Sequence, residues 1–436
     1  MIEISGIFIQ VLIFLLIFSF PFTPELLGNF FGLKKTFNLV DSHCINIIFF
    51  CYTCLFFSFL NFDLRIFFKV YFFLSIIFFF FNIKNLKLVN KSKDLILFFI
   101  FFLLVISTFF SIGQNLKLEW DGHFWFEKVL VFFNGENIEN LKNTKANPGY
   151  PHLGSYIWAF FWKNSLIQLE YFGRLFYVYF YFASIFLILN SLKNDNYYLK
   201  ILLLFSFFIL SYDPFLFGGY QEYLIFSCLI IASRYISLIN FSKIGDLRLI
   251  FLILFILYIN VWFKNEGLVY FLIFSILLIL YLNISLNKKI LFFIFIFSLI
   301  FLQYFLKENF IGFFQFFHSG EFSSYLPDDF TNFEIFLKKI IKIFYYMIIG
   351  FIKYPLWLLI FIGIIVQFLV LKNNSIINSY FLSTLLINLF FIIFIFFAEK
   401  NLDFMLRVTL DRLLFQTSGF YLILFLLILS KIKIKL

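Results

Sequence analysis

The chain has 436 residues, of which 63% are hydrophobic and only 13% are charged, whereas a soluble domain carries about 25% charged residues. This composition excludes an ordinary soluble domain. The net charge of +10 fits an excess of lysine on one face of a membrane rather than nucleic-acid binding, and the four cysteines, all in or beside apolar segments, predict no metal site.

Apolar runs long enough to cross a bilayer as helices recur from one end of the chain to the other. They predict an all-α polytopic membrane protein with about 11–13 transmembrane helices, forming a single domain over residues 1–436. The predicted spans are residues 6–22, 44–62, 66–83, 95–112, 171–190, 200–212, 222–239, 248–263, 267–284, 290–306, 354–371, 377–398 and 413–430. The run 153–163 is too short to cross and is expected at the interface or as a re-entrant segment.

Short basic segments alternate along the chain with segments that carry most of the acids. By the positive-inside rule, the basic segments, such as residues 84–93 and 431–435, face the cytoplasm. Two of the outward segments are long, 113–155 and 307–353, and long loops are often functional. We therefore expect a protein of the bacterial inner membrane whose active face points outward.

The first outward segment contains EWDGHFWFEK. If it is helical, Asp121, Trp125 and Lys128 share one face at i, i+4 and i+7 spacing. The Asp121 carboxylate suits a general base, or a divalent-cation ligand together with Glu119. The alternative is an amphipathic helix that lies at the membrane surface. The candidate substrate-binding residues of this segment are Glu119, Trp120, His123, Trp125 and Lys128.

Residues 147–162 read NPGYPHLGSYIWAFFW. The two prolines and the glycine before the aromatic run enforce an irregular backbone, which at membrane depth must be buried in protein or line a watery cavity. Tyr150 and His152 are candidates for ligand contact; the alternative for His152 is a solvated side chain near the interface.

Two polar segments interrupt the later apolar runs. DPFLFGGYQEY, residues 213–223, makes a tight Gly-Gly turn and supplies Tyr220 and Glu222 as candidate substrate ligands. FKNEGL, residues 263–268, supplies Glu266 and the point charge of Lys264, which suits a phosphate. Charged groups at such depth are functional candidates; a polar hairpin between two helices is the alternative.

The last polar segment is DFMLRVTLDRLLFQTSGF, residues 403–420. Arg407 and Arg412 offer planar forks for phosphate or carboxylate. The alternative is a local ion pair between Arg407 and Asp411, which stand at i, i+4 spacing.

These motifs resemble the GT-C class of integral-membrane glycosyltransferases, which includes protein mannosyltransferases and lipid A aminoarabinose transferases. The resemblance rests on three short motifs: Trp120-Asp121 with Trp125 and Lys128, then Tyr150-Pro151-His152-Leu153, then Lys264-Asn265-Glu266-Gly267. One feature departs from the family pattern, because four predicted spans precede the acidic loop where better-known members have one.

The resemblance implies a function and a set of roles. The donor would be a polyprenyl-phosphate-linked sugar, and the acceptor a glycan, lipid or protein at the outer face, within membrane lipid and without nucleic acid. Asp121 would be the catalytic base, and the donor phosphate would be bound by Lys264, Arg407 and Arg412. No cofactor is required beyond a possible divalent cation.

Two other functions are compatible with the topology. An O-antigen-type polysaccharide polymerase or ligase would rely on Arg and His in a large outer loop, but residues 307–353 carry only His318 and no Arg. A lipid or solute transporter would often show repeat symmetry and ionisable groups near the midplane, and the sequence shows no repeat.

Overall fold

The computed structural model describes residues 2–32, 37–82, 92–115, 118, 120–145, 148–192, 197–239, 241, 247–313, 333–369, 376–398 and 401–429. These residues form helices joined by turns, and no strand occurs among them. The all-helical class predicted from the sequence is therefore confirmed.

The helices follow one another with short connections. The first part of the chain contains α1 (Ile2–Ile17), α2 (Pro24–Phe30), α3 (Leu39–Phe59), α4 (Leu64–Asn82), α5 (Ser92–Asn115), α6 (Trp120–Phe133), the 3-10 helix η1 (Ile138–Asn143), α7 (Leu153–Lys163), α8 (Tyr171–Ser191) and α9 (Tyr197–Ser211). The second part contains η2 (Pro214–Phe217), α10 (Glu222–Ile236), α11 (Leu247–Tyr258), α12 (Asn260–Phe263), α13 (Glu266–Tyr281), α14 (Leu286–Ile311), α16 (Phe333–Lys353), α17 (Leu356–Leu369), α18 (Ile376–Ala398), α19 (Leu402–Val408) and α20 (Leu410–Leu429).

Within the described residues, five helices are long and apolar enough to cross a membrane, namely α3, α4, α8, α14 and α18. The number is six if α16 and α17, which meet at a bend of 100°, form one broken span. Several of the other predicted spans coincide with apolar helices in which 10–17 residues were described. The membrane class is supported, and the long helices are fewer than the 11–13 predicted.

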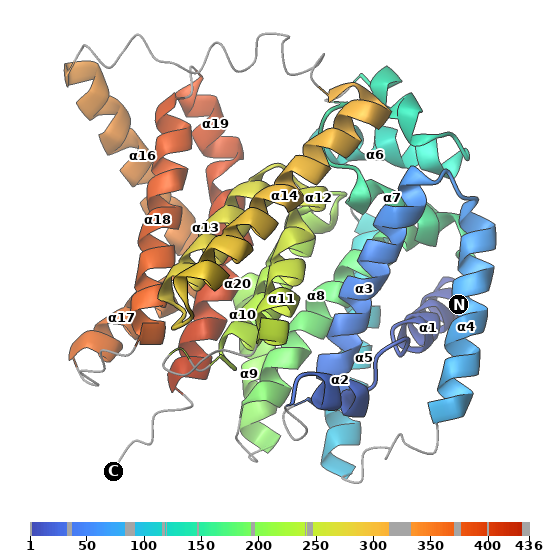
Figure 1. The fold of residues 1–436 in the computed structure, drawn as a ribbon. Coiled ribbons are helices and arrows are strands. Elements are labelled where there is room, and N and C mark those ends of the chain that lie inside the picture. Colours follow the sequence, from blue (N-terminus) through green and yellow to red (C-terminus); the bar gives the residue numbers. More distant parts are fainter. Residues whose placement is uncertain are drawn as a thin grey trace.

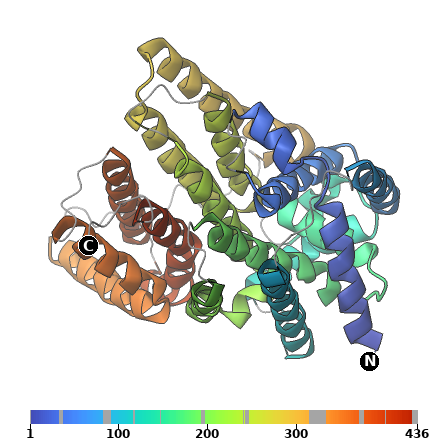
Figure 2. The same cartoon turned by 90° about the horizontal axis from the view of Figure 1, so that it is seen from below.

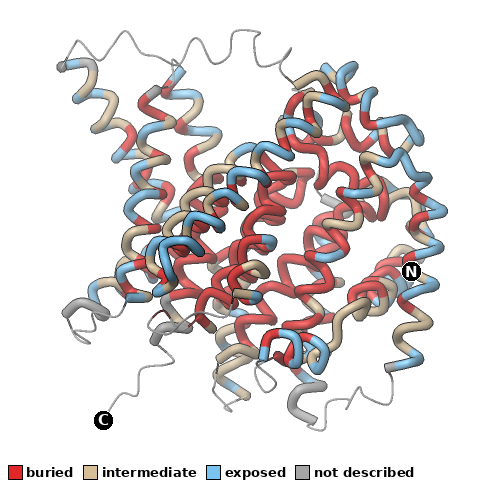
Figure 3. The backbone as a smooth tube through the Cα atoms, in the orientation of Figure 1, coloured by how far each residue is buried: buried red, intermediate tan, exposed pale blue. Residues whose placement is uncertain are grey.

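The surface and the interior of the bundle both carry apolar side chains. Helix α8 lies entirely inside the protein, whereas α14 exposes a row of large side chains: Ile290, Leu291, Ile294, Phe297 and Phe301. A water-soluble monomer rarely exposes so continuous an apolar surface. Figure 3 shows this contrast between the buried centre and the outer helices. The distribution is that of a protein whose outer helices contact lipid.

The bundle is ordered along the sequence. The N-terminal helices and α16–α20 lie on opposite sides, with the middle helices between them (Figure 2). Helix α10 packs against α8, α11 and α20 and so joins the two sides. Because α10 and α20 form the most extensive helix pair, residues from the middle and the end of the chain meet.

The helices run between two ends of the bundle (Figure 1). We call them the Glu222 end, where α10, α13 and α20 begin, and the Arg234 end, where α10 finishes and α3 begins. Asn38 and Asp41 form a capping box that starts α3 at the Arg234 end: Asn38 accepts from the backbone N–H of Asp41, and Asp41 accepts from that of Asn38. The Glu222 end corresponds to the segments predicted to face outward.

The prediction that residues 307–353 form a long loop is wrong at both ends of the segment, where helices occur. Helix α14 continues to Ile311, where Gly312 in the left-handed conformation ends it. Helix α16 then occupies 333–353, with an amphipathic pattern that hydropathy averages away. Residues 314–332, which include His318, lie outside the described residues.

Candidate functional site

Four segments of the chain meet at the Glu222 end and bring five charged side chains together. We call these side chains the charge network: Asp121, Glu222, Lys264, Glu266 and Arg412. They come from the first turn of α6, the first residue of α10, the break between α12 and α13, and the first turn of α20. All five are residues that the sequence analysis singled out, and the charged members Asp121 and Arg412 stand 291 positions apart.

The network is connected by short ion pairs. Arg412 Nη1 lies 2.5 Å from Asp121 Oδ2 and 3.5 Å from Glu222 Oε1. Lys264 Nζ lies 2.9 Å from that same Glu222 oxygen and 3.1 Å from Glu266 Oε1. The Glu222 side chain is fully buried. Glu222 is therefore the centre of the network, held between two cations.

Local backbone geometry places these side chains. Lys264 has extended backbone angles, which end α12 and let α13 begin two residues later. Gly267 permits the tight hairpin, because a Cβ there would lie 2.0 Å from the Asn260 carbonyl oxygen. The predicted polar interruption at residues 263–268 is confirmed, and its lysine points into the protein rather than to solvent.

Glycines also bring α6 against the segment before α10. The Cα of Gly122 lies close to Gly219, and a Cβ at Gly122 would lie 2.3 Å from the Gly218 carbonyl oxygen. Asp121 and Tyr220 are thereby neighbours of the same cation: the Arg412 guanidinium stands 5.1 Å from the centre of the Tyr220 ring. The close backbone contact sets the reach of Asp121.

The network holds three carboxylates and two cations, so it carries a net negative charge when all five groups are ionised. Burial alone lowers the pKa of a lysine, but the carboxylates of Glu222 and Glu266 outweigh burial and raise the pKa of Lys264. Lys264 is therefore charged at any physiological pH. Buried groups of this kind need each partner, because an uncompensated charge costs several kcal/mol.

A second polar group lies further along α6. The predicted shared face is confirmed: Trp125 and Lys128 are both buried, and Asp121 is about half-buried. Lys128 Nζ donates to the Tyr150 carbonyl oxygen at 2.9 Å and stands 5.4 Å from the Trp125 ring and 5.8 Å from the Tyr150 ring. This helix face contacts protein, so α6 is not an amphipathic helix lying on the surface with this face in water.

His152 is fully buried, which corrects the alternative of a solvated histidine. Ser58 Oγ lies 2.7 Å from the Leu55 carbonyl, to which it can donate, and 2.8 Å from His152 Nε2; we assign the tautomer in which Nε2–H donates to Ser58. Burial, together with the ammonium groups of Lys128 and Lys307, lowers the pKa of His152 to about 3. The ring is neutral at physiological pH, and its Nδ1 is a buried acceptor without a partner among the described residues.

Two predicted site residues lie away from the charge network. Arg407 is exposed and donates to the hydroxyl of Tyr346 at 3.0 Å. The expected pair between Arg407 and Asp411 does not form, because α19 ends at Val408 and the helical spacing is interrupted; Asp411 pairs with Lys353 instead. His123 is exposed on α6.

Glu119 lies outside the described residues, as does the side chain of Trp120. One ligand of the expected divalent-cation site at Glu119 and Asp121 is therefore outside the described residues. In the described ranges, no three His, Cys, Asp or Glu side chains come together as metal ligands.

The structure adds polar residues that the sequence analysis did not select. Asp213 accepts from the Tyr354 hydroxyl at 2.7 Å and lies 3.9 Å from Lys353. Arg174 forms two 2.9 Å hydrogen bonds with Glu170 and a 3.0 Å bond with the Phe217 carbonyl. Arg174 stood inside a predicted span, where a charged residue is itself a signal of a buried partner. These contacts hold η2 beside the network.

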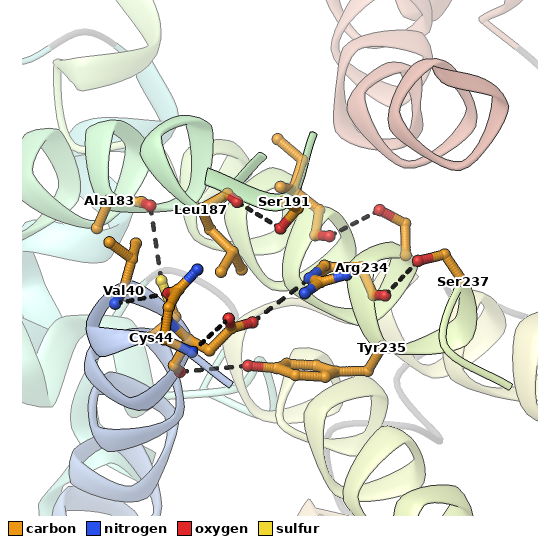
Figure 4. Close-up of polar contacts among 12 residues, drawn as sticks. Val40, Cys44, Ala183, Leu187, Ser191, Arg234, Tyr235 and Ser237 are labelled. Atoms are coloured by element: carbon orange, nitrogen blue, oxygen red, sulfur yellow. Dashed lines mark hydrogen bonds and ion pairs between the residues drawn. The ribbon is translucent and has the colours of Figure 1, made fainter. Parts of the chain in front are cut away.

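A separate polar cluster lies at the Arg234 end. Arg234 Nε lies 3.4 Å from Asp41 Oδ1, and the Tyr235 hydroxyl donates to the Asp41 carbonyl at 3.2 Å. Figure 4 shows Arg234 and Tyr235 directed at the first turn of α3, near Cys44. Cys44 Sγ is within 3.5 Å of the Ala183 carbonyl. All these groups are partnered, so we assign the cluster to the packing of α3, α8 and α10.

Comparison with known proteins finds no matching family model, no matching curated protein and no matching solved structure. The candidate site therefore rests on its own geometry and chemistry.

Proposed function

We propose that the chain is a GT-C-like integral-membrane glycosyltransferase, which moves a sugar from a polyprenyl-phosphate-linked donor to an acceptor hydroxyl at the Glu222 end. That end would face outward from a bacterial inner membrane, as the basic loops of the opposite end favour. The observation that carries the proposal is the convergence of Asp121, Glu222, Lys264 and Arg412, from distant parts of the chain, in one buried network.

Glycosyl transfer from a phosphate needs a base. In the proposed reaction, Asp121 takes the proton from the acceptor hydroxyl, whose oxygen then bonds to the anomeric carbon. The bond between that carbon and the phosphate oxygen breaks, and the polyprenyl phosphate leaves with the electron pair. General-base catalysis of this kind contributes about 10²–10⁴ in rate.

The network suits Asp121 to this role. Arg412 holds the carboxylate at 2.5 Å and is itself fixed by Glu222. When Asp121 takes a proton, the network loses one negative charge, which lowers the repulsion of the anionic leaving group. Lys264 acts indirectly, because it holds Glu222 in place.

The proposal can be tested in the cells that make the protein. Mass spectrometry of the glycolipids and glycans would compare cells with the gene, without it, and with it restored. We expect a glycan or glycolipid to lose a sugar residue when the gene is absent and to regain it on restoration. An unchanged glycome would count against the proposal. Movement of an intact substrate across the membrane would favour a transporter.

A further inference from the structure

A buried pair of lysines lies beside the network, and one of them was not recognised in the sequence. Lys307 is in the last turns of α14, and Lys128 is on α6; each is almost fully buried. The ring of Phe59 contacts both His152, at 5.4 Å between ring centres, and Phe310 of α14, at 5.1 Å, while Lys128 bonds to the backbone two residues before His152. Helices α14 and α6 both pack against η1, so the two lysines are on helices that share a neighbour.

Lys307 differs from the cations of the charge network. Lys264 and Arg412 each contact two carboxylates within 4.0 Å, whereas Lys307 has no ion pair with any described carboxylate. Its ammonium group stands 5.3 Å from the centre of the Phe313 ring. A buried amine without an anion either gives up its proton or binds an anion from outside the chain, and a phosphate that entered would stabilise its charged form.

His152 supplies an independent indication of a ligand. Its Nδ1 is buried, unprotonated and without a partner among the residues described, so it can accept a hydrogen bond from a hydroxyl group. The same region therefore contains lysine side chains that can bind an anion and a histidine nitrogen that can accept from a hydroxyl group. A phosphorylated sugar carries both of these groups.

The spacing along α6 connects this place with Asp121. Lys128 is seven positions after Asp121, and at 1.5 Å per residue the two lie about 10 Å apart along one helix face. That length is comparable to the distance from an acceptor hydroxyl, through an anomeric carbon, to its phosphate. Trp125 lies between them on the same face, with its ring centre 6.2 Å from that of Tyr150.

We propose that Lys307 and Lys128 bind the phosphate of the donor, and that His152 Nδ1 accepts a hydrogen bond from a hydroxyl of its sugar. The inference rests on the proposed function for the identity of the sugar donor, but the binding of a phosphate does not. The sequence favours Lys264, Arg407 and Arg412 as ligands of the donor phosphate. We assign the phosphate instead to Lys307, which has no ion pair with a described carboxylate, and to Lys128.

Binding of a lipid phosphate tests this site without any transfer reaction. The purified full chain in detergent micelles would be titrated calorimetrically with farnesyl phosphate, with farnesol, and with inorganic phosphate. We expect Lys307→Met to weaken the binding of farnesyl phosphate by about tenfold or more, because a charge-assisted contact is lost. Lys307→Arg keeps the charge and should keep the binding.

Lys288→Met is the matched control, because Lys288 lies on the same helix, exposed, at the opposite end. It should leave the affinity unchanged, and farnesol should bind the parent chain and Lys307→Met equally. The melting temperature of Lys307→Met should be equal to or above that of the parent, since a buried charge is removed. A weaker affinity of Lys307→Met for inorganic phosphate would also support the site. The ratio of the parent chain's affinities for farnesyl phosphate and for inorganic phosphate distinguishes a lipid-borne phosphate from a free one.

The site would be overturned if the parent chain and folded Lys307→Met bind farnesyl phosphate with equal affinity. It would also be overturned if the parent chain binds neither farnesyl phosphate nor inorganic phosphate. The two proposals can also fail separately. If Lys307→Met loses the phosphate binding that the parent chain shows, and the parent chain transfers no sugar, the proposed function is contradicted and the phosphate site is retained.

Discussion

Lys264→Met is expected to destabilise the folded protein by about 3–5 kcal/mol, the usual cost of removing one partner of a buried ion pair. Lys264 is the nearer of the two cations that hold Glu222, at 2.9 Å against 3.5 Å for Arg412. The second carboxylate oxygen of Glu222 is buried without a hydrogen-bond partner among the described residues. The variant therefore leaves a buried carboxylate with one longer contact.

The free energy of unfolding would be measured by titration of mixed micelles with a denaturing detergent, followed by tryptophan fluorescence. Adding Glu222→Gln should recover part of the loss, because the two changes remove the same interaction and are not additive. Lys338→Met is the matched control: its pair with Glu334 has both side chains about three-quarters exposed, and such pairs contribute about 0.3–0.5 kcal/mol. Equal losses in the two lysine variants would refute the buried network.

Gly122→Ala is expected to affect both stability and activity, because the contact between α6 and the Gly218–Gly219 turn has no room for a methyl group. The new Cβ would meet the Gly218 carbonyl oxygen at 2.3 Å, and backbone cannot turn aside as a side chain can. Overpacking costs about 1–3 kcal/mol. A displacement of Asp121 by about 1 Å would lower the rate of transfer by about a hundredfold.

Gly350→Ala provides the comparison for this variant. The nearest atom to its new Cβ is the end of the Leu414 side chain, at 2.6 Å, which can change rotamer. We expect a change in unfolding free energy below about 1 kcal/mol and unchanged transfer. If Gly122→Ala behaves like Gly350→Ala in the unfolding titration and in the transfer assay, the close approach of α6 to the Gly218–Gly219 turn is contradicted.

Much of the candidate site could be predicted because polar residues are rare in this chain. Each charged interruption of an apolar run has few places to go other than the interior or a membrane surface. Asp121, Glu222, Lys264 and Arg412 were selected on this ground, and they are the residues that meet. The shared face of Asp121, Trp125 and Lys128 followed from helical spacing alone.

Other features depend on which helices meet, and a single sequence does not contain that information directly. Arg407 was selected with Arg412, but the break at Thr409 turns it toward Tyr346 instead. Lys307 was placed at the start of a long loop, whereas α14 carries it into the interior. Arg234 is in a predicted span and its partner Asp41 precedes a different one. The two meet only because the end of α10 lies beside the first turn of α3.

The described residues contain five or six helices long enough to cross a membrane, fewer than the 11–13 spans predicted. Hydropathy averages composition over a window and does not fix where a helix begins and ends, so a predicted span such as 200–212 coincides with a shorter apolar helix, Tyr197–Ser211. Nor does it separate a helix buried in protein, such as α7, from one that faces lipid.

The central claim is that Asp121 is the base of a sugar transfer. The most direct measurement is transfer of a labelled sugar from a synthetic polyprenyl phosphate to an acceptor by the purified chain in lipid vesicles, with wild type, Asp121→Asn and Glu139→Gln compared. Glu139 is an exposed acid at the same end of the bundle. We predict that Asp121→Asn lowers the rate by about 10²–10⁴ while the protein stays folded, and that Glu139→Gln does not change it. Transfer by Asp121→Asn at the wild-type rate would contradict the account.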